Sequence, residues 1–435
     1  MFNRIIIVAF FTGFGHLINL FILKFLSSNI PKYSVAKIGE IDSFILLIVS
    51  LLGFGLQLSA TRKLAIIENW KQEYYSTQSA RIALSLVLMI LALTGFFVFK
   101  NILFLAAPIL ALNGDYALYG RGLPKMGAFV SFLRVAIPAI SLLLSAIYIP
   151  DFLIEIFTLS IIISYLIAGK IVSTSLKVKY FVKPKLHNLK KYVDHLDIGF
   201  ASVAFIFLGL GLVNVVSFFY SDEVTAIVYL FLKFHIIFKG VRQILVQSFY
   251  RELIEEALSI KVDFIAIIAG LFYFIIMAFY NDILSTLVFN QNFMVYSKVF
   301  ILLGFAGFVS SFTTSSGARL LLLNKDHQYS KNLIIAGITT IILTILLYYS
   351  FGNQPFLIAL SIVVGELMLS ILNIMALNER NYIIKRIMIT YPIFLLSFSF
   401  LFLSLLIHNS FISVTLLSLI YLTYTFFVVR KKINS

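Results

Sequence analysis

The chain has 435 residues, of which 61% are apolar and 12% are charged, about half of the roughly 25% charged residues in soluble domains. A water-soluble protein of this length cannot use so much apolar surface, because its exterior must stay wet, so the excess must face lipid. The absence of cysteine excludes disulfide bonds, thiolate catalysis and cysteine-bound metals.

Long apolar stretches follow one another along the whole chain. A membrane-spanning helix needs about 20 mostly apolar residues, and the first stretch is long enough and lacks the cleavage site of a signal peptide. The sequence therefore predicts an all-α polytopic membrane protein with about fourteen spanning helices. The predicted spans are 5–26, 38–61, 78–99, 101–119, 125–148, 152–174, 197–219, 224–248, 262–280, 296–320, 332–350, 355–377, 386–407 and 411–430.

The basic residues between these spans predict the orientation. Cytoplasmic loops of membrane proteins carry an excess of Lys and Arg, and here that excess falls on every second loop through to the end of the chain. Both termini are therefore predicted to be cytoplasmic. The net charge of +15 then reflects topology, and nucleic-acid binding is not expected. The inner side receives Arg4; Arg62, Lys63, Lys71 and Arg81; Arg121 and Lys125; the basic loop 177–191; Arg251 and Lys261; Arg319, Lys325 and Lys331; Arg380, Lys385 and Arg386; and Arg430, Lys431 and Lys432.

A basic linker divides the chain near its middle. The segments where the fourth and the tenth spans end, 115–125 and 316–326, resemble each other weakly and lie six spans apart, as a repeated six-helix bundle would place them. Such repeats commonly hold a substrate site between the halves, near the middle of the bilayer. The predicted divisions are an N-terminal lobe at 1–176, a cytoplasmic linker at 177–195, a C-terminal lobe at 196–378, and two further spans with a basic tail at 379–435.

The eighth predicted span carries four basic or titratable side chains at membrane depth. At about 100° per residue, His235, Lys239 and Arg242 share one narrow face, and Lys233 points roughly the opposite way. Ionisable groups in a bilayer are costly, so each requires a partner or a function. The shared face suits an anionic ligand or an aqueous cavity. Alternatively, Lys239 and Arg242 reach the inner interface, and Lys233 pairs with an acid on another span.

Two other spans carry ionisable groups that a cavity could use. Arg134 lies in a stripe of small and hydroxyl residues on the fifth span, and it either pairs with Asp115 or faces a substrate. Glu366 lies near the centre of the twelfth span, where a carboxylate can take up a proton or neutralise a buried cation. Glu366 and Asp115 are therefore candidates for proton or cation coupling.

No catalytic constellation is found. None of the six histidines has a second ligand at metal-binding spacing, and no glycine-rich phosphate loop or nucleophile motif occurs. A membrane glycosyltransferase, polymerase or ligase would need a sizeable exterior loop for its catalytic residues, and none is available. The sequence predicts a transporter with no cofactor and no metal, although a structural protein stays an alternative.

The second span ends in the segment 53–63, Gly-Phe-Gly-Leu-Gln-Leu-Ser-Ala-Thr-Arg-Lys. This segment resembles one in Wzx-type O-antigen flippases, which form part of the polysaccharide-transport branch of the MOP exporter superfamily. MurJ and the MATE exporters belong to the same superfamily. The resemblance extends to the end of the fourth span, with Gly120, Gly122 and Lys125, and in span order to nearly the whole chain. The family's tryptophan-rich end of this span is represented by Tyr116 and Tyr119 here, and fourteen spans rather than twelve leave the subgroup open.

The resemblance implies two six-helix lobes that flip an undecaprenyl-diphosphate-linked oligosaccharide to the periplasmic leaflet of a bacterial inner membrane by alternating access. It implies membrane lipids, and other polysaccharide-assembly membrane proteins, as partners. Arg62 at the inner end of the second span would suit the diphosphate, since guanidinium groups favour bidentate phosphate contacts, but a plain interfacial anchor is an equal alternative. A MATE-like exporter of small organic cations is the rival function. The candidate substrate residues are Arg62, Arg134, Lys233, His235, Lys239 and Arg242.

Overall fold

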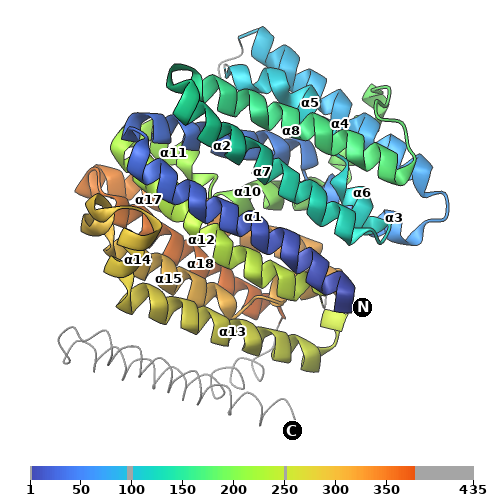
Figure 1. Ribbon diagram of the computed structural model, residues 1–435. Helices are drawn as coiled ribbons and strands as arrows, with labels where there is room; N and C mark the ends of the chain where they lie inside the picture. The colour runs from blue at the N-terminus through green and yellow to red at the C-terminus, as the bar shows by residue number, and fades with distance from the viewer. Residues whose placement is uncertain (1, 96–100, 249–251, 378–435) are drawn as a thin grey trace. The chain divides into compact units, whose positions relative to one another are not determined.

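A computed structural model describes residues 2–95, 101–248 and 252–377, and every regular element in these ranges is a helix (Figure 1). In this part of the chain nine helical segments are long and apolar enough to cross a membrane. The chain is an all-α polytopic membrane protein, as predicted. The predicted spans 386–407 and 411–430 lie outside the described residues.

The chain forms two compact units, and their boundary cuts through two helices. The first unit comprises residues 1–234 and 341–354. Its elements are α1 (Phe2–Asn29), α2 (Lys32–Gly53), α3 (Leu56–Ile66), α4 (Trp70–Leu93), η2 (Ile102–Ala106), α5 (Ala107–Ala111), α6 (Asp115–Gly120), α7 (Pro124–Tyr148), η3 (Pro150–Phe152), α8 (Leu153–Leu176), η4 (Leu186–Leu189), α9 (Lys190–Val193), α10 (Leu196–Ile206), α11 (Leu212–Phe219), and parts of α12 (Asp222–Ser248) and α17 (Asp326–Phe351).

The second unit comprises residues 235–340 together with the residues from 355 onward. It holds the remaining parts of α12 and α17. Its other elements are η5 (Glu252–Ile254), α13 (Glu256–Phe279), α14 (Asn281–Val288), η6 (Gln291–Tyr296), α15 (Lys298–Ser311), α16 (Ser316–Leu322) and α18 (Pro355–Leu377). The predicted lobe boundary at the linker 177–195 stays a prediction.

The second predicted span, 38–61, is broken in the middle, whereas the sequence predicts a continuous helix. Phe54 and Gly55 have φ angles of 26° and 75°, which a right-handed helix cannot contain. At Gly55 a Cβ atom would lie 2.8 Å from the backbone nitrogen of Gly199 on α10. Glycine therefore serves two purposes at this position, because it permits the left-handed conformation and lets two backbones touch.

The seventh predicted span, 197–219, is also broken. The helix α10 ends at Ile206, and a turn closed by the N–H groups of Gly209 and Gly211, each 3.0 Å from the Ile206 carbonyl oxygen, leads into α11. The broken second and seventh spans pack along each other. Two hydrogen bonds join them: Ser43 Oγ donates to the Leu210 carbonyl oxygen at 2.8 Å, and Ser50 Oγ donates to that of Ser202 at 3.2 Å. Ser59 Oγ of the second span also lies 2.8 Å from Nε2 of His195, the last residue of the linker.

The fourth span is interrupted at residues 112–114, between α5 and α6, and the preceding span supplies polar groups at the gap. Gln78 Nε2 of α4 donates to the Ala111 carbonyl oxygen at 2.6 Å, and Arg81 donates to that of Asn113. Backbone groups inside a membrane must be satisfied by protein. Arg81, which the charge count places on the inner loops, is instead 1% exposed within α4.

The tenth span has an equivalent interruption at residues 312–315, between α15 and α16. Asp263 of α13 accepts hydrogen bonds from the N–H and the Oγ of Ser315, both at 2.7 Å. Again the preceding span supplies the polar partner. The two interruptions lie six spans apart, at the ends that the sequence comparison pairs, which supports the predicted internal repeat.

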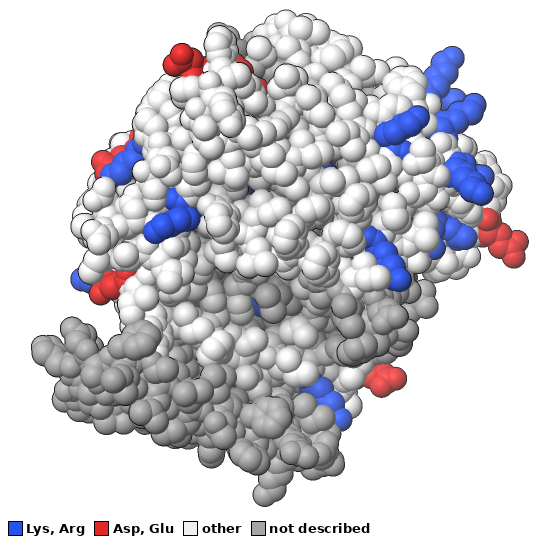
Figure 2. Space-filling model, in the orientation of Figure 1, with Lys and Arg blue, Asp and Glu red and all other residues white. Residues whose placement is uncertain are grey.

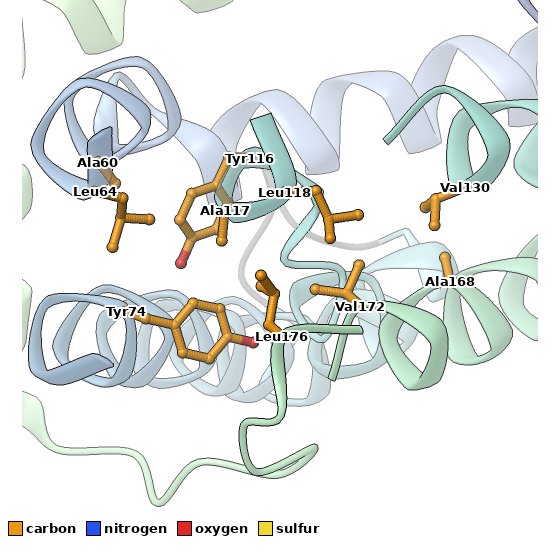
Figure 3. Packing of buried hydrophobic residues seen from close by; sticks show 10 residues of the cluster. All are labelled: Ala60, Leu64, Tyr74, Tyr116, Ala117, Leu118, Val130, Ala168, Val172 and Leu176. Atoms are coloured by element: carbon orange, nitrogen blue, oxygen red, sulfur yellow. The ribbon is translucent and has the colours of Figure 1, made fainter. Parts of the chain in front are cut away.

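The core of the first unit lies where α3, α4, α6, α7 and α8 meet, and α7 and α8 run side by side (Figure 1). Figure 3 shows the side chains of this cluster, including the rings of Tyr74 and Tyr116, whose centroids lie 6.3 Å apart. Small residues such as Ala117 and Ala168 let the helices approach closely. This core holds the polar half-helix α6 in place.

Basic side chains gather at one end of the first unit, where α3 lies (Figure 2). The linker 177–195 is fixed there to the helices. Lys191 Nζ lies 2.9 Å from Glu73 Oε1 of α4, and Tyr192 Oη donates to the Leu52 carbonyl oxygen at 2.7 Å. Burial raises the pKa of Tyr192, so the phenol stays a neutral donor. The exposed basic residues of this end include Arg62, Lys63, Lys71, Lys177 and Lys179.

Candidate functional site

The long helix α12 carries the four candidate residues of the eighth predicted span. It begins with Asp222 and Glu223, and acidic side chains in a first turn favour the helix by interacting with its dipole. Lys233 belongs to the first unit and His235, Lys239 and Arg242 belong to the second. The structure gives each of these four side chains a polar partner on another helix.

Lys233 forms an ion pair with Asp42 of α2, so an acid on another span does meet this lysine. Tyr229, one turn earlier on α12, donates to the same carboxylate at 3.2 Å. Its ring packs against Gly39, where a Cβ atom would lie 2.7 Å from the ring. Glycine thus allows α2 and α12 to approach closely enough for this ion pair.

Lys239 forms an ion pair with Glu366 of α18, with Nζ and Oε1 2.7 Å apart. The Glu366 side chain is only 5% exposed and that of Lys239 is 17% exposed. Ser370 and Asn373 follow Glu366 on the same helix and are also buried. Of the two roles open to Glu366, neutralising a buried cation is the arrangement present here.

His235 and Arg242, the other two residues on the face of α12 that they share with Lys239, contact neutral groups. Nδ1 of His235, a fully buried residue, lies 3.2 Å from the Tyr273 hydroxyl of α13. The guanidinium of Arg242 donates to Ser310 Oγ of α15. Among the ion pairs between described residues, none includes Arg242, and its Nε is buried without a hydrogen-bond partner. Arg242 therefore forms no ion pair of its own in the described part, although Glu366, the partner of Lys239, also interacts with it electrostatically.

A second polar cluster lies inside the first unit. Arg134 of α7 donates to Asp115 Oδ2 at 2.7 Å and to Ser131 Oγ at 3.1 Å, and its guanidinium lies 5.4 Å from the centre of the Tyr165 ring. Gln57, just beyond the break of the second span, donates to Asp115 Oδ1 at 3.4 Å. The structure thus shows the paired alternative for Arg134 and Asp115.

Arg62, the remaining candidate, is exposed on α3 at the basic end of the first unit. Within the described residues, no group of three histidines or carboxylates could hold a metal ion. Four of the partner residues seen here, Asp42, Gln57, Tyr273 and Ser310, are not among the residues that the sequence predicts for the site. The sequence does contain a signal for Asp42, because Lys233 lies on the opposite face of its helix and therefore requires a separate acidic partner.

No protein-family model matches the chain, and no curated protein matches it. Several solved structures do. The lipid II flippase MurJ in an inward closed conformation aligns with a TM-score of 0.74 at 16% identity, over 98% of this chain and 100% of that chain. An outward-facing multidrug resistance MATE family transporter of the MOP superfamily aligns with a TM-score of 0.55 at 15% identity, over 86% of this chain and 92% of that chain.

A MOP superfamily transporter from Pyrococcus furiosus, described as having a binding pocket of reversed polarity, aligns with a TM-score of 0.55 at 16% identity, over 86% of this chain and 92% of that chain. At such identities the likeness establishes the fold. The chain has the fold of MOP superfamily transporters, as the sequence resemblance predicts. Its membership of the superfamily and of the Wzx-type branch stays a prediction.

Proposed function

We propose that this protein flips an undecaprenyl-diphosphate-linked oligosaccharide from the cytoplasmic to the periplasmic leaflet by alternating access, for O-antigen or another surface polysaccharide. The fold it shares with a lipid II flippase supports a lipid-linked substrate. The sugar head crosses the membrane through the protein, and the lipid tail stays in the bilayer. The protein is not an enzyme and resides in a bacterial inner membrane.

One observation carries this proposal: Arg242, within a helix long and apolar enough to span a membrane, has a serine hydroxyl as its hydrogen-bond partner. A guanidinium in such a place is costly unless an anion joins it. The substrate diphosphate is an anion of suitable shape, because guanidinium groups bind phosphate oxygens in a bidentate manner. Each unit carries further candidate residues: His235 and Lys239 lie in the second unit with Arg242, and Lys233, Arg134 and Arg62 lie in the first.

Substitution of Arg242 tests this role. In cells that depend on this protein for surface polysaccharide, Arg242→Ala is expected to lower polysaccharide by at least about tenfold, since a charge-assisted hydrogen bond contributes roughly 1.5–3 kcal/mol. Arg242→Lys is expected to keep part of the activity. Immunoblotting of the membrane fraction controls for insertion. Normal polysaccharide with Arg242→Ala would remove this residue from the substrate site.

A MATE-like exporter of small organic cations, coupled to protons or sodium, is the second candidate. Its support is the shared fold together with two acids at membrane depth, Glu366 and Asp115, which would be the coupling residues. Against it, both acids form ion pairs with basic side chains. Proteoliposomes separate the two functions: export of ethidium would support the second, and flipping of a fluorescent lipid-linked oligosaccharide the first.

The proposed topology has its own test, because the chain contains no cysteine and single cysteines can be introduced at will. Lys179→Cys in the basic linker and Asp151→Cys between α7 and α8 both lie at exposed positions. In intact cells, a maleimide that does not cross the inner membrane is expected to label only Asp151→Cys. Lys179→Cys should react only after the membrane is opened. The reverse pattern would invert the orientation.

A further inference from the structure

Asp42 is a carboxylate that has no assigned role, although it lies against a candidate substrate residue. It stands on α2, in the part of the second span that precedes the break, and pairs with Lys233 of α12. Lys233 Nζ also lies 5.6 Å from the centre of the Tyr229 ring. If Lys233 binds an anionic substrate, it must exchange the Asp42 carboxylate for that anion.

The two ion pairs of α12 differ in their access to water. The side chains of Lys233 and Asp42 are 19% and 25% exposed, whereas the carboxylate paired with Lys239 belongs to a side chain that is only 5% exposed. The Asp42 carboxylate is therefore less enclosed by protein than the Glu366 carboxylate. An exchange of partners is easier here than in a fully enclosed pair, where an abandoned charge costs several kcal/mol.

Asp42 also keeps a partner when Lys233 leaves it. The Tyr229 hydroxyl donates to the same carboxylate oxygen, and the tyrosine ring is fixed because it packs against Gly39. Tyr165 of α8 also interacts electrostatically with Asp42, whereas Lys37 and Glu40, which precede Asp42 on α2, form an ion pair with each other. The Asp42 carboxylate can therefore keep its hydrogen bond from Tyr229 while Lys233 exchanges partners.

We propose that Asp42 is a displaceable counter-ion, which holds Lys233 in the empty transporter and yields it to the diphosphate of the substrate. A diphosphate carries more negative charge than a carboxylate and offers more acceptor oxygens, so it competes well for the ammonium. Asp42 acts through Lys233 as a positioning residue, and Lys233 leaves Asp42 when the diphosphate binds. The idea rests on the proposed function.

The test measures how tightly the purified protein in lipid nanodiscs binds farnesyl diphosphate, a short lipid probe that carries a diphosphate without the sugars. Asp42→Asn is expected to tighten binding roughly fivefold, because the competing charge is gone. Asp42→Glu should restore the wild-type affinity. Lys233→Met should weaken binding, and Asp42→Asn added to Lys233→Met should bring no gain. Farnesol, which lacks the phosphates, should not respond to any variant.

Glu40→Gln is the matched control, since it removes one charge from the same helix and leaves the Asp42 pair intact. It should not change the affinity. Asp42→Ser, which keeps a hydroxyl beside Tyr229, gives the same test if Asp42→Asn does not purify. Unchanged or weaker binding by Asp42→Asn and Asp42→Ser, with a wild type that binds, would contradict the counter-ion role of Asp42 and would not affect the proposed flippase function. A wild type that does not bind the probe would overturn both.

Discussion

Glu366→Leu is expected to destabilise the protein by about 3–5 kcal/mol, the effect of leaving one member of a buried ion pair alone. Lys239 would keep its charge in a place where its side chain is 17% exposed, and α18 would offer it no counter-charge there. The expected result is a strong fall in the amount of protein in the membrane and in the melting temperature of what can be purified.

The double variant Glu366→Leu with Lys239→Met separates stability from function. Replacing both charges by apolar groups of similar size commonly costs little, so folding is expected to return while transport does not. Glu40→Leu provides a comparison at a more exposed pair, where the loss should stay below about 1 kcal/mol. Wild-type melting of the single variant Glu366→Leu would show that the pair contributes nothing to stability.

Gly199→Ala is expected to prevent the broken second span from packing against α10. The new Cβ atom would lie 2.2 Å from Cδ1 of the Phe54 ring, far inside contact distance. The ring cannot retreat freely, because Phe200 and Tyr192 pack around it at centroid distances of 5.2 and 6.3 Å. Overpacking of this kind costs roughly 1–3 kcal/mol, and transport should fall with stability.

A second substitution distinguishes this clash from a general glycine effect. Phe54→Ala removes the ring, so the pair Gly199→Ala with Phe54→Ala should melt higher than Gly199→Ala alone. Gly209→Ala is the control glycine, since its nearest neighbour to a new Cβ atom is at 3.7 Å, an ordinary contact. Equal losses for Gly199→Ala and Gly209→Ala would contradict the packing argument. Thermal unfolding in detergent gives the melting temperatures of the wild type, Gly199→Ala, Gly209→Ala and the double variant.

Hydrophobicity was enough to predict the helices, because each span must bury its backbone polar groups within itself. It could not predict where a span is interrupted, since an interrupted span stays apolar. The dipeptide Asn113-Gly114 and the run from Thr313 to Gly317 are turn signals inside predicted spans, and they mark two of the breaks. At the break of the second span, the only signals in the sequence are the glycines Gly53 and Gly55.

Helical periodicity predicted the shared face of His235, Lys239 and Arg242, because that face depends on a single helix. Their partners depend on which helices meet, and no pattern within one span contains that information. Arg134 and Asp115 were an exception, since consecutive spans tend to be neighbours. The pairing of Lys233 with Asp42 joins residues 191 positions apart and had to come from the structure.

The interrupted fourth span has a consequence for how the protein is made. Its gap leaves the carbonyl groups of Ala111 and Asn113 without helical partners, and Gln78 and Arg81 of the third span supply them. An unsatisfied backbone group in hydrocarbon costs several kcal/mol, so this span is a poor candidate to settle in lipid alone. The third and fourth spans are therefore expected to leave the insertion machinery as one unit, so that the third span enters the lipid only after the fourth has been made.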